Sequence, residues 1–181
     1  MRRRTLIATV GAVVGTGLGA AAYTSATVTR SATIGVSADD AALVQLTPSA
    51  DFSQITKDGG GQLSINFSSL NGGSEFVFGD TVNPNTTYAF SITPSEANDV
   101  TFSYSLGNGS DPAASNPNVH FEVFSWDNET STATSQMTAS EESSGTFTPT
   151  AGTTYYVVLT IDTTNVDTST SDLSGTLTIT A

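Results

Sequence analysis

The stretch VTFSYSL, residues 100–106, alternates apolar and small polar side chains with a period of two. Successive side chains of a β-strand point to opposite faces of a sheet, so this alternation predicts a strand with one buried face and one wetted face. The same pattern recurs in residues 63–67, 88–92, 119–123, 155–161 and 173–179. In the last run Gly175 falls in the apolar phase, which is typical of a β-bulge.

Clusters of Gly, Asn, Asp, Pro and Ser separate these runs, as turns between strands do. No long helical pattern follows residue 22. The sequence therefore predicts an all-β fold, an antiparallel, jelly-roll-like β-sandwich of about eight to ten strands. Residues 107–118, 127–145 and 162–172 are expected to be loops, the second with a weak strand at Gln136-Met137.

The first 22 residues have the composition of an export signal. Arg2, Arg3 and Arg4 precede an uncharged stretch, residues 5–22, that is rich in Ala and Gly. A basic head, an apolar stretch and small residues at its end are typical of a secretory signal. Ala20 and Ala22 are the small residues expected around the cleavage site, so we place the start of the mature chain near Tyr23.

Two export routes remain open. Arg3-Arg4 fits a loose twin-arginine pattern, but Arg2 stands where that pattern usually has Ser or Thr, so Sec export is the alternative. A retained signal would have an apolar stretch of about 18 residues, the lower limit for a membrane-spanning helix. We expect a secreted protein at the cell surface, in contact with a membrane only through an uncleaved signal.

The charge of the chain excludes several classes of function. It has 5 Lys and Arg, 17 Asp and Glu, one His and no Cys. Without Cys there is neither a disulfide framework nor a thiolate metal site. The net charge of −12 argues against a nucleic-acid partner, because phosphate groups would be repelled.

The mature chain is more acidic still. Beyond residue 22 only Arg30 and Lys57 are basic, and two bases against 17 acids give a net charge of −15. Molar salt shortens the Debye length to about 3 Å and relieves the repulsion between these charges. We therefore expect a halophilic, most plausibly archaeal, source and folding that depends on salt.

Few residues suit catalysis. His120 alternates with Val119 and Phe121 and is interpreted as a surface histidine, and a single His cannot form a His-Glu-x-x-His zinc site. Glu141-Glu142 lies in a polar stretch and is interpreted as a solvated charge pair rather than as the acid and base of a glycosidase. We expect no catalytic residues, no cofactor and no enzymatic activity.

Calcium binding is the weak alternative for the acidic loops. The best candidates are Asp162, Asn165, Asp167 and Asp172, because Ca²⁺ prefers oxygen ligands. The stretch lacks the glycine and the terminal glutamate of an EF-hand loop. We therefore predict no dedicated metal site.

Four Asn-x-Ser/Thr sequences are candidate glycosylation sites, at Asn66, Asn85, Asn108 and Asn128. Asn108 and Asn128 lie in or beside predicted loops, where a sugar can be attached without disturbing a strand. These two are the predicted acceptors.

Residues 23–37 form a strand pattern of their own. One face of the extended segment carries Ala26, Val28, Arg30, Ala32, Ile34 and Val36, of which only Arg30 is charged. The segment begins at the expected new N-terminus, so nothing upstream tethers it. It can close the sheet of its own chain or complete the sheet of a neighbouring copy by strand addition, and the pattern alone leaves both open.

A family resemblance favours donation to a neighbour. Four stretches carry it, in order along the chain: residues 22–26 at the signal junction, the strand at 60–67, the turn that opens a strand at 82–90, and the closing strand at 173–181. They resemble the TasA/camelysin-like secreted proteins, in particular haloarchaeal relatives that are related to archaeal bundling-pilus subunits. The segment after Phe90 departs from the family pattern.

The resemblance implies a jelly-roll domain that polymerises into extracellular fibres or matrix by donating its N-terminal strand. The proteolysis implied by the camelysin name does not transfer, since His120 alone cannot supply the zinc site. The predicted organisation is a signal peptide at 1–22, a donor strand at 23–37 and a β-sandwich at 38–181. The expected partners are copies of the same chain, and the alternative is a monomeric surface module that binds glycan or calcium.

Overall fold

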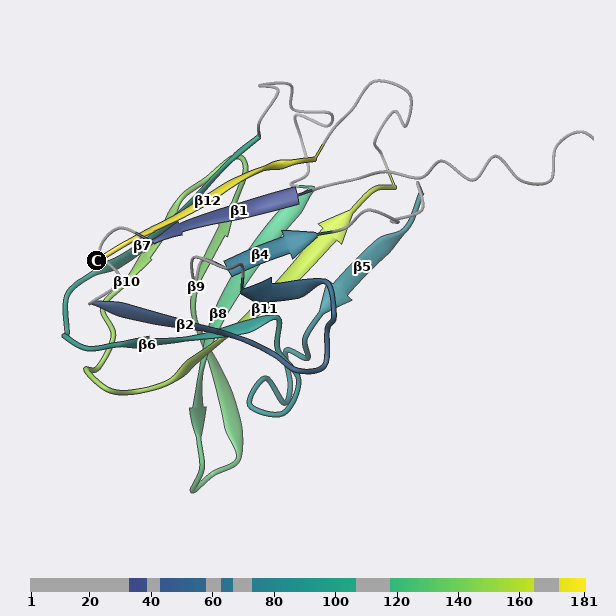
Figure 1. Ribbon diagram of the computed structural model, residues 1–181. Coiled ribbons are helices and arrows are strands. Elements are labelled where there is room, and N and C mark those ends of the chain that lie inside the picture. Colours follow the sequence, from purple (N-terminus) through teal and green to yellow (C-terminus); the bar gives the residue numbers. More distant parts are fainter. Residues whose placement is uncertain (1–32, 39–42, 58–62, 67–72, 107–117, 165–172) are drawn as a thin grey trace, which may run out of the picture.

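The computed structural model describes residues 33–38, 43–57, 63–66, 73–106, 118–164 and 173–181. These residues form twelve strands and no helix (Figure 1). The strands are β1 (Thr33–Ala38), β2 (Val44–Pro48), β3 (Ile55–Lys57), β4 (Leu63–Asn66), β5 (Glu75–Phe78), β6 (Phe90–Pro94), β7 (Val100–Leu106), β8 (Val119–Asp127), β9 (Thr132–Ser140), β10 (Gly145–Phe147), β11 (Tyr155–Asp162) and β12 (Gly175–Thr180).

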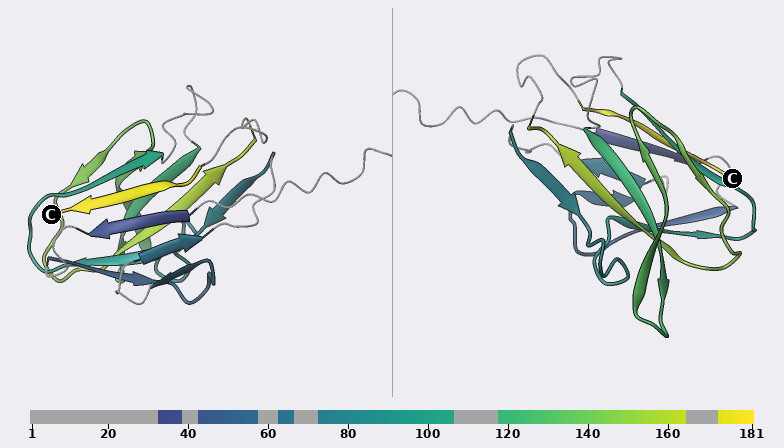
Figure 2. Two further views of the ribbon diagram at one scale, coloured as in Figure 1. Left: turned by 45° about the horizontal axis from the view of Figure 1, so that its top comes forward. Right: turned by 180° about the vertical axis from the view of Figure 1, so that it is seen from behind.

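The strands lie in two sheets packed face to face (Figure 2). Sheet A has the order β10-β7-β12-β1-β4-β3, and sheet B has the order β2-β6-β11-β8-β9. The short strand β5 also pairs with β11, beyond the residues of β11 that pair with β6. From β6 to β12 the chain crosses between the sheets repeatedly, as in jelly rolls. The predicted β-sandwich is confirmed.

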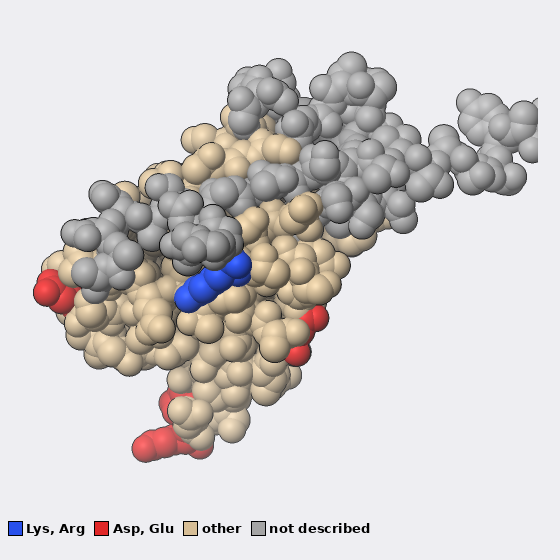
Figure 3. Space-filling view, in the orientation of Figure 1, with Lys and Arg blue, Asp and Glu red and all other residues tan. Residues whose placement is uncertain are grey.

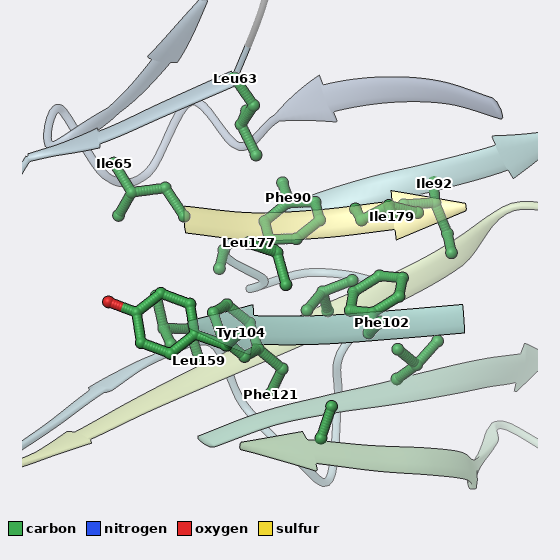
Figure 4. Close-up of a cluster of buried hydrophobic side chains, with 14 of the residues drawn as sticks. Leu63, Ile65, Phe90, Ile92, Phe102, Tyr104, Phe121, Leu159, Leu177 and Ile179 are labelled. Atoms are coloured by element: carbon green, nitrogen blue, oxygen red, sulfur yellow. The ribbon is translucent and has the colours of Figure 1, made fainter. Parts of the chain in front are cut away.

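The core lies between the sheets and follows the predicted alternation. Phe90 of sheet B stacks on Phe102 of sheet A with ring centroids 6.4 Å apart and planes 6° apart (Figure 4). Tyr104 of sheet A packs against Phe121 of sheet B at 5.7 Å. Fully burying one such side chain contributes about 1.5–3 kcal/mol, so the alternating runs supply most of the force that holds the sheets together.

Residues 127–145 differ most from the prediction. The expected loop is largely strand, because Thr132–Ser140 pairs with β8 along its whole length. The outer half of this hairpin projects beyond both sheets (Figures 1 and 2). We call the projecting part, residues 125–136, the arm. Period-two alternation arises when one face of a strand is buried, so it is missing where both faces meet water.

The strand count exceeds the expected eight to ten for a related reason. Three of the additional strands, β3, β5 and β10, have only three or four residues. Runs this short are below the length at which alternation can be read from a sequence.

Gly175 is not at a bulge. It pairs in regular register with Leu106, and the register continues without a shift to Thr180. A Cβ at Gly175 would lie 2.3 Å from the carbonyl oxygen of Ser105 and 2.6 Å from the Tyr104 hydroxyl oxygen. Glycine is required here because the Tyr104 ring crosses this position, and its hydroxyl donates a hydrogen bond of 2.5 Å to the carbonyl oxygen of Leu173.

Candidate self-assembly site

The first described strand lies in the middle of sheet A. β1 runs parallel to β12, from Ile34 opposite Gly175 to Ala38 opposite Ile179. On its other side it runs antiparallel to β4, with Thr33 opposite Asn66. In Figure 1 it is the purple strand between β12 and β4. Among the described strands, β1 and β12 form the one parallel pair.

Sheet A depends on this strand for its continuity. No pairing links β12 directly to β4 in the described sheet, so without β1 it would consist of two parts, β10-β7-β12 and β4-β3. The strands that flank this position carry fully buried side chains, Leu177 and Ile65 among them. We call the position between β12 and β4 the β1 slot; whichever strand fills it completes both the hydrogen-bond ladder and the cover over the core.

The predicted self-assembly residues are only partly within the structure. Ile34 and Val36 belong to β1, where the register sets them opposite Ile65 and Leu177 of the same chain. For these residues the single chain shows the self-paired alternative. The other four, Ala26, Val28, Arg30 and Ala32, lie outside the described residues, as do the signal residues Ala20 and Ala22.

The residues considered for catalysis lie on β8 and just after β9. His120 is half-buried in β8, between Ser140 of β9 and Thr160 of β11, which agrees with the predicted surface position. Glu142 is exposed, as predicted.

For Glu141 the prediction of a solvated charge was wrong. Its carboxylate accepts the backbone N–H groups of Asn118 and of Val119, the latter at 2.9 Å. It satisfies two donors at the start of β8, and burying those donors without a partner would be costly.

Of the four calcium candidates, only Asp162 lies within the described residues. One carboxylate oxygen of Asp162 accepts the N–H of Thr164 at 2.7 Å and its hydroxyl at 2.6 Å, so Asp162 stabilises its own turn. Asn165, Asp167 and Asp172 lie outside the described residues. Within the described ranges, no three His, Asp or Glu side chains are arranged to hold a metal ion.

An aromatic cluster on the outer face of sheet B was not anticipated. Phe124 and Val158 are buried yet separate from the main core, and Phe124 pairs with Tyr156. Tyr88 covers Tyr156 with ring centroids 5.1 Å apart. Burial raises the pKa of Tyr156, and neighbouring Tyr88 adds to the shift. The sequence signal was weak, because apolar residues on both faces of β8 and β11 blur the alternation.

The arm continues from this cluster into solvent. Trp126, the only tryptophan of the chain, is half-buried and shares a face with Phe124 two residues before it. Its partner across the hairpin is Ala133. Beyond it, residues 127–132 are all exposed.

The turn at the tip of the arm is held by Asp127. One of its carboxylate oxygens accepts the N–H of Glu129 at 2.8 Å and the N–H of Thr130 at 3.3 Å. Hydrogen bonds from the Thr130 side chain, then from these two N–H groups, hold the pKa of Asp127 below its usual value. Ser131 closes the turn with a φ of 53°.

Charge is distributed as the sequence predicts. The only base in the described part of the chain is Lys57, exposed on the edge strand β3 (blue in Figure 3). Carboxylates are spread over the rim of the face shown and gather at the projecting end of the arm (red in Figure 3).

Within the described residues, no helix is long and apolar enough to cross a bilayer. No protein-family model, curated protein or solved structure matches this chain. The likeness to the TasA/camelysin-like proteins therefore stays a prediction from the sequence.

Proposed function

We propose that this protein is an exported, non-enzymatic structural subunit that assembles with copies of itself by exchanging β1. The observation that carries the proposal is the place of β1: the first described strand of the chain occupies the centre of a sheet, between β12 and β4. In the assembly, β1 of one copy fills the slot of the next copy in the same register.

The topology makes this exchange feasible. β1 is joined to the rest of the described fold only through residues 39–43, on the way to β2. A strand with a single connection can leave a sheet without passing the chain through a loop. A short connection between exchanged elements also favours exchange over self-closure.

The self-paired and the exchanged arrangements of β1 are expected to have similar free energies. An exchanged β1 forms the same hydrogen-bond ladder with β12 and β4 that it forms within one chain. The number of bonds is unchanged, and the two arrangements differ only in which copy supplies β1. Leu177 and Ile65 beside the slot are fully buried when it is filled. An empty slot would expose these apolar side chains to water, so it is expected to be filled by one strand or another. Donation from each copy to the next is a head-to-tail interface, which produces an open filament when the rotation between copies does not close a ring.

The self-paired strand favours a second candidate. A subunit whose own β1 fills the slot is a closed sandwich and can act alone as a surface binding module. The outward-facing Tyr88 and Tyr156 would be the residues that contact a glycan, since sugar rings pack on exposed aromatic faces. The two candidates differ in whose β1 fills the slot.

Cysteine cross-linking tests whose strand fills the slot. The chain has no Cys, so an introduced pair has no background. Ser37→Cys and Thr178→Cys occupy paired positions on β1 and β12, and neighbouring strands are close enough for a disulfide. Mixed single variants, assembled in molar salt and oxidised, are expected to form disulfides between copies. The double variant is expected to form a covalent ladder on a non-reducing gel.

The matched control is Ser105→Cys with Thr176→Cys, a pair on β7 and β12 that stays within one copy in either arrangement. Its product is expected to be monomeric. Cross-linked monomers from the Ser37/Thr178 double variant, with no product from the mixed single variants, would overturn exchange and support the monomeric module.

A further inference from the structure

The tip of the arm is an accessible part of the described fold. Residues 127–132 are all exposed, and the hairpin that carries them extends away from both sheets (Figures 1 and 2). The tip contains Asn128-Glu129-Thr130, which has the Asn-x-Thr pattern of an N-glycosylation acceptor. An enzyme that modifies Asn128 meets no neighbouring element of the described sandwich.

The other described sequences of this pattern are less suited to modification. Asn85 is half-buried in the turn before β6, its Oδ1 atom is fully enclosed, and the following Thr86 bonds back to the carbonyl oxygen of Asn83. Asn66 is the last residue of β4, and its N–H donates to the carbonyl oxygen of Gln54 at 2.8 Å. Both are held by backbone pairing or burial. Asn108 lies outside the described residues.

We propose that Asn128 carries an N-linked glycan and that its first sugar packs on the indole of Trp126. The inference rests on the export part of the proposed function, because the modifying enzyme acts on chains that cross a membrane. It does not rest on strand exchange.

The attachment step is balanced with a sugar donor of the polyisoprenoid-phosphate class. The Nδ2 atom of Asn128 forms a bond to the anomeric carbon of the donor sugar. The bond from that carbon to the phosphate oxygen breaks, and the lipid phosphate leaves with the electron pair. The amide loses one proton to the transferase.

The position of Trp126 supports the packing of the first sugar on its indole. Trp126 is in β8, which ends at Asp127, and Asn128 is the first residue of the turn that follows, two residues along the chain from Trp126. Trp126 is half-buried opposite Ala133, and part of its surface stays in contact with water. The C–H face of a pyranose ring can cover this apolar surface while the sugar hydroxyls stay in water, as aromatic side chains with one wet side permit.

A sugar packed on Trp126 would stabilise the arm. A two-stranded hairpin outside a larger sheet is marginally stable in water. The arm has only β8 and β9, with water on both faces of its outer half. A sugar on Trp126 adds apolar contact to the part of its side chain that the protein leaves exposed.

Intact-mass measurement tests the modification. The full-length gene is expressed in its natural host, and the protein is collected outside the cells. We expect a mass excess over the mature sequence that Asn128→Gln and Thr130→Val each reduce by the mass of one glycan. Thr130→Ser, which keeps the acceptor pattern, is expected to retain it, and Asn85→Gln is the control that leaves the mass excess unchanged.

The fluorescence of the single tryptophan tests the packing. Removing the glycan by Asn128→Gln, which leaves the hydrogen bonds between Thr130 and Asp127 in place, is expected to shift the emission maximum of Trp126 to longer wavelength and to increase quenching by a neutral quencher about two-fold. Thr130→Ser is expected to behave as the parent protein. Identical emission from glycosylated and unglycosylated forms would overturn the packing.

The outcomes separate this inference from the function on which it rests. Extracellular protein with the unmodified mass at Asn128 would overturn glycosylation and leave export and strand exchange intact. Protein confined to the cytoplasm would overturn both. Glycosylated protein that fails to cross-link between copies would support the inference while contradicting strand exchange.

Discussion

Glu141 and Glu142 are neighbours in the sequence with opposite roles in the fold. Glu141 accepts two backbone N–H groups at the start of β8, whereas Glu142 is exposed. A carboxylate between two donors stabilises a strand end that the sheet itself leaves unpaired. Two like residues in a polar stretch give no sign of which one turns inward.

This difference predicts unequal effects of substitution. Glu141→Ala leaves the N–H groups of Asn118 and Val119 without their acceptor and is expected to lower the free energy of unfolding by about 1–3 kcal/mol. Glu142→Ala, the matched control, is expected to change it by no more than about 0.5 kcal/mol. Urea unfolding in molar salt measures both. Equal effects would contradict the assigned role of Glu141.

Asp127 makes the stability of the turn at the tip of the arm depend on pH. Its pKa is lowered in the folded arm by hydrogen bonds from Thr130 and Glu129. A lowered pKa means that the ionised carboxylate stabilises the turn at pH values above the unfolded pKa. This contribution is lost as the pH falls through the folded pKa, which lies below the usual value of about 3.9.

We therefore expect Trp126 fluorescence to report loosening of the arm only below about pH 4. Asp127→Asn is expected to remove that transition, because no carboxylate is left to protonate at this position. The two proteins are compared in an acid titration at constant salt. A transition of the same amplitude in both would show that other acids cause it.

Burial on one side decided which elements were predictable. β7, β11 and β12 were predicted from their alternation because each has one face in the core. Of β9 only the weak strand at Gln136-Met137 was predicted, because Thr132, Thr134 and Ser135 are exposed to water on both faces of the arm. The partners of β1 could not be read from its own residues, since its register is set by β12 and β4, which come later in the chain.

The arm itself should be dispensable for folding. Its side chains lie outside the main core cluster, so replacing residues 125–134 with Asn-Gly would join Phe124 to its partner Ser135 through a two-residue hairpin turn. We expect the shortened protein to melt within about 2–4 °C of the parent, the shift that about 1 kcal/mol produces in a domain of this size. Circular dichroism measures it, and loss of the folded sheet signal would contradict the claim.

At the scale of the whole molecule, electrostatics opposes both folding and assembly. The chain carries a net charge of −12, and Lys57 is the single base of its described part. Like charges on a compact surface repel one another, and assembly brings the surfaces of two copies together. Salt therefore acts on the fold and on the filament through the same screening.

The last prediction follows from this repulsion. Stability to urea is expected to rise steeply with NaCl up to about 1 M, where the Debye length has fallen to about 3 Å. Three exposed acids on separate elements, Glu75, Glu96 and Glu142, can be changed to Lys together, which moves the net charge from −12 to −6 because each change adds two. We expect the triple variant to reach the same urea midpoint at lower salt.

The matched control changes three exposed threonines, Thr132, Thr134 and Thr176, to Ser and leaves the charge unchanged. If specific ion binding rather than general repulsion sets the salt requirement, the triple Lys variant will need as much salt as the parent, and the electrostatic account will be wrong.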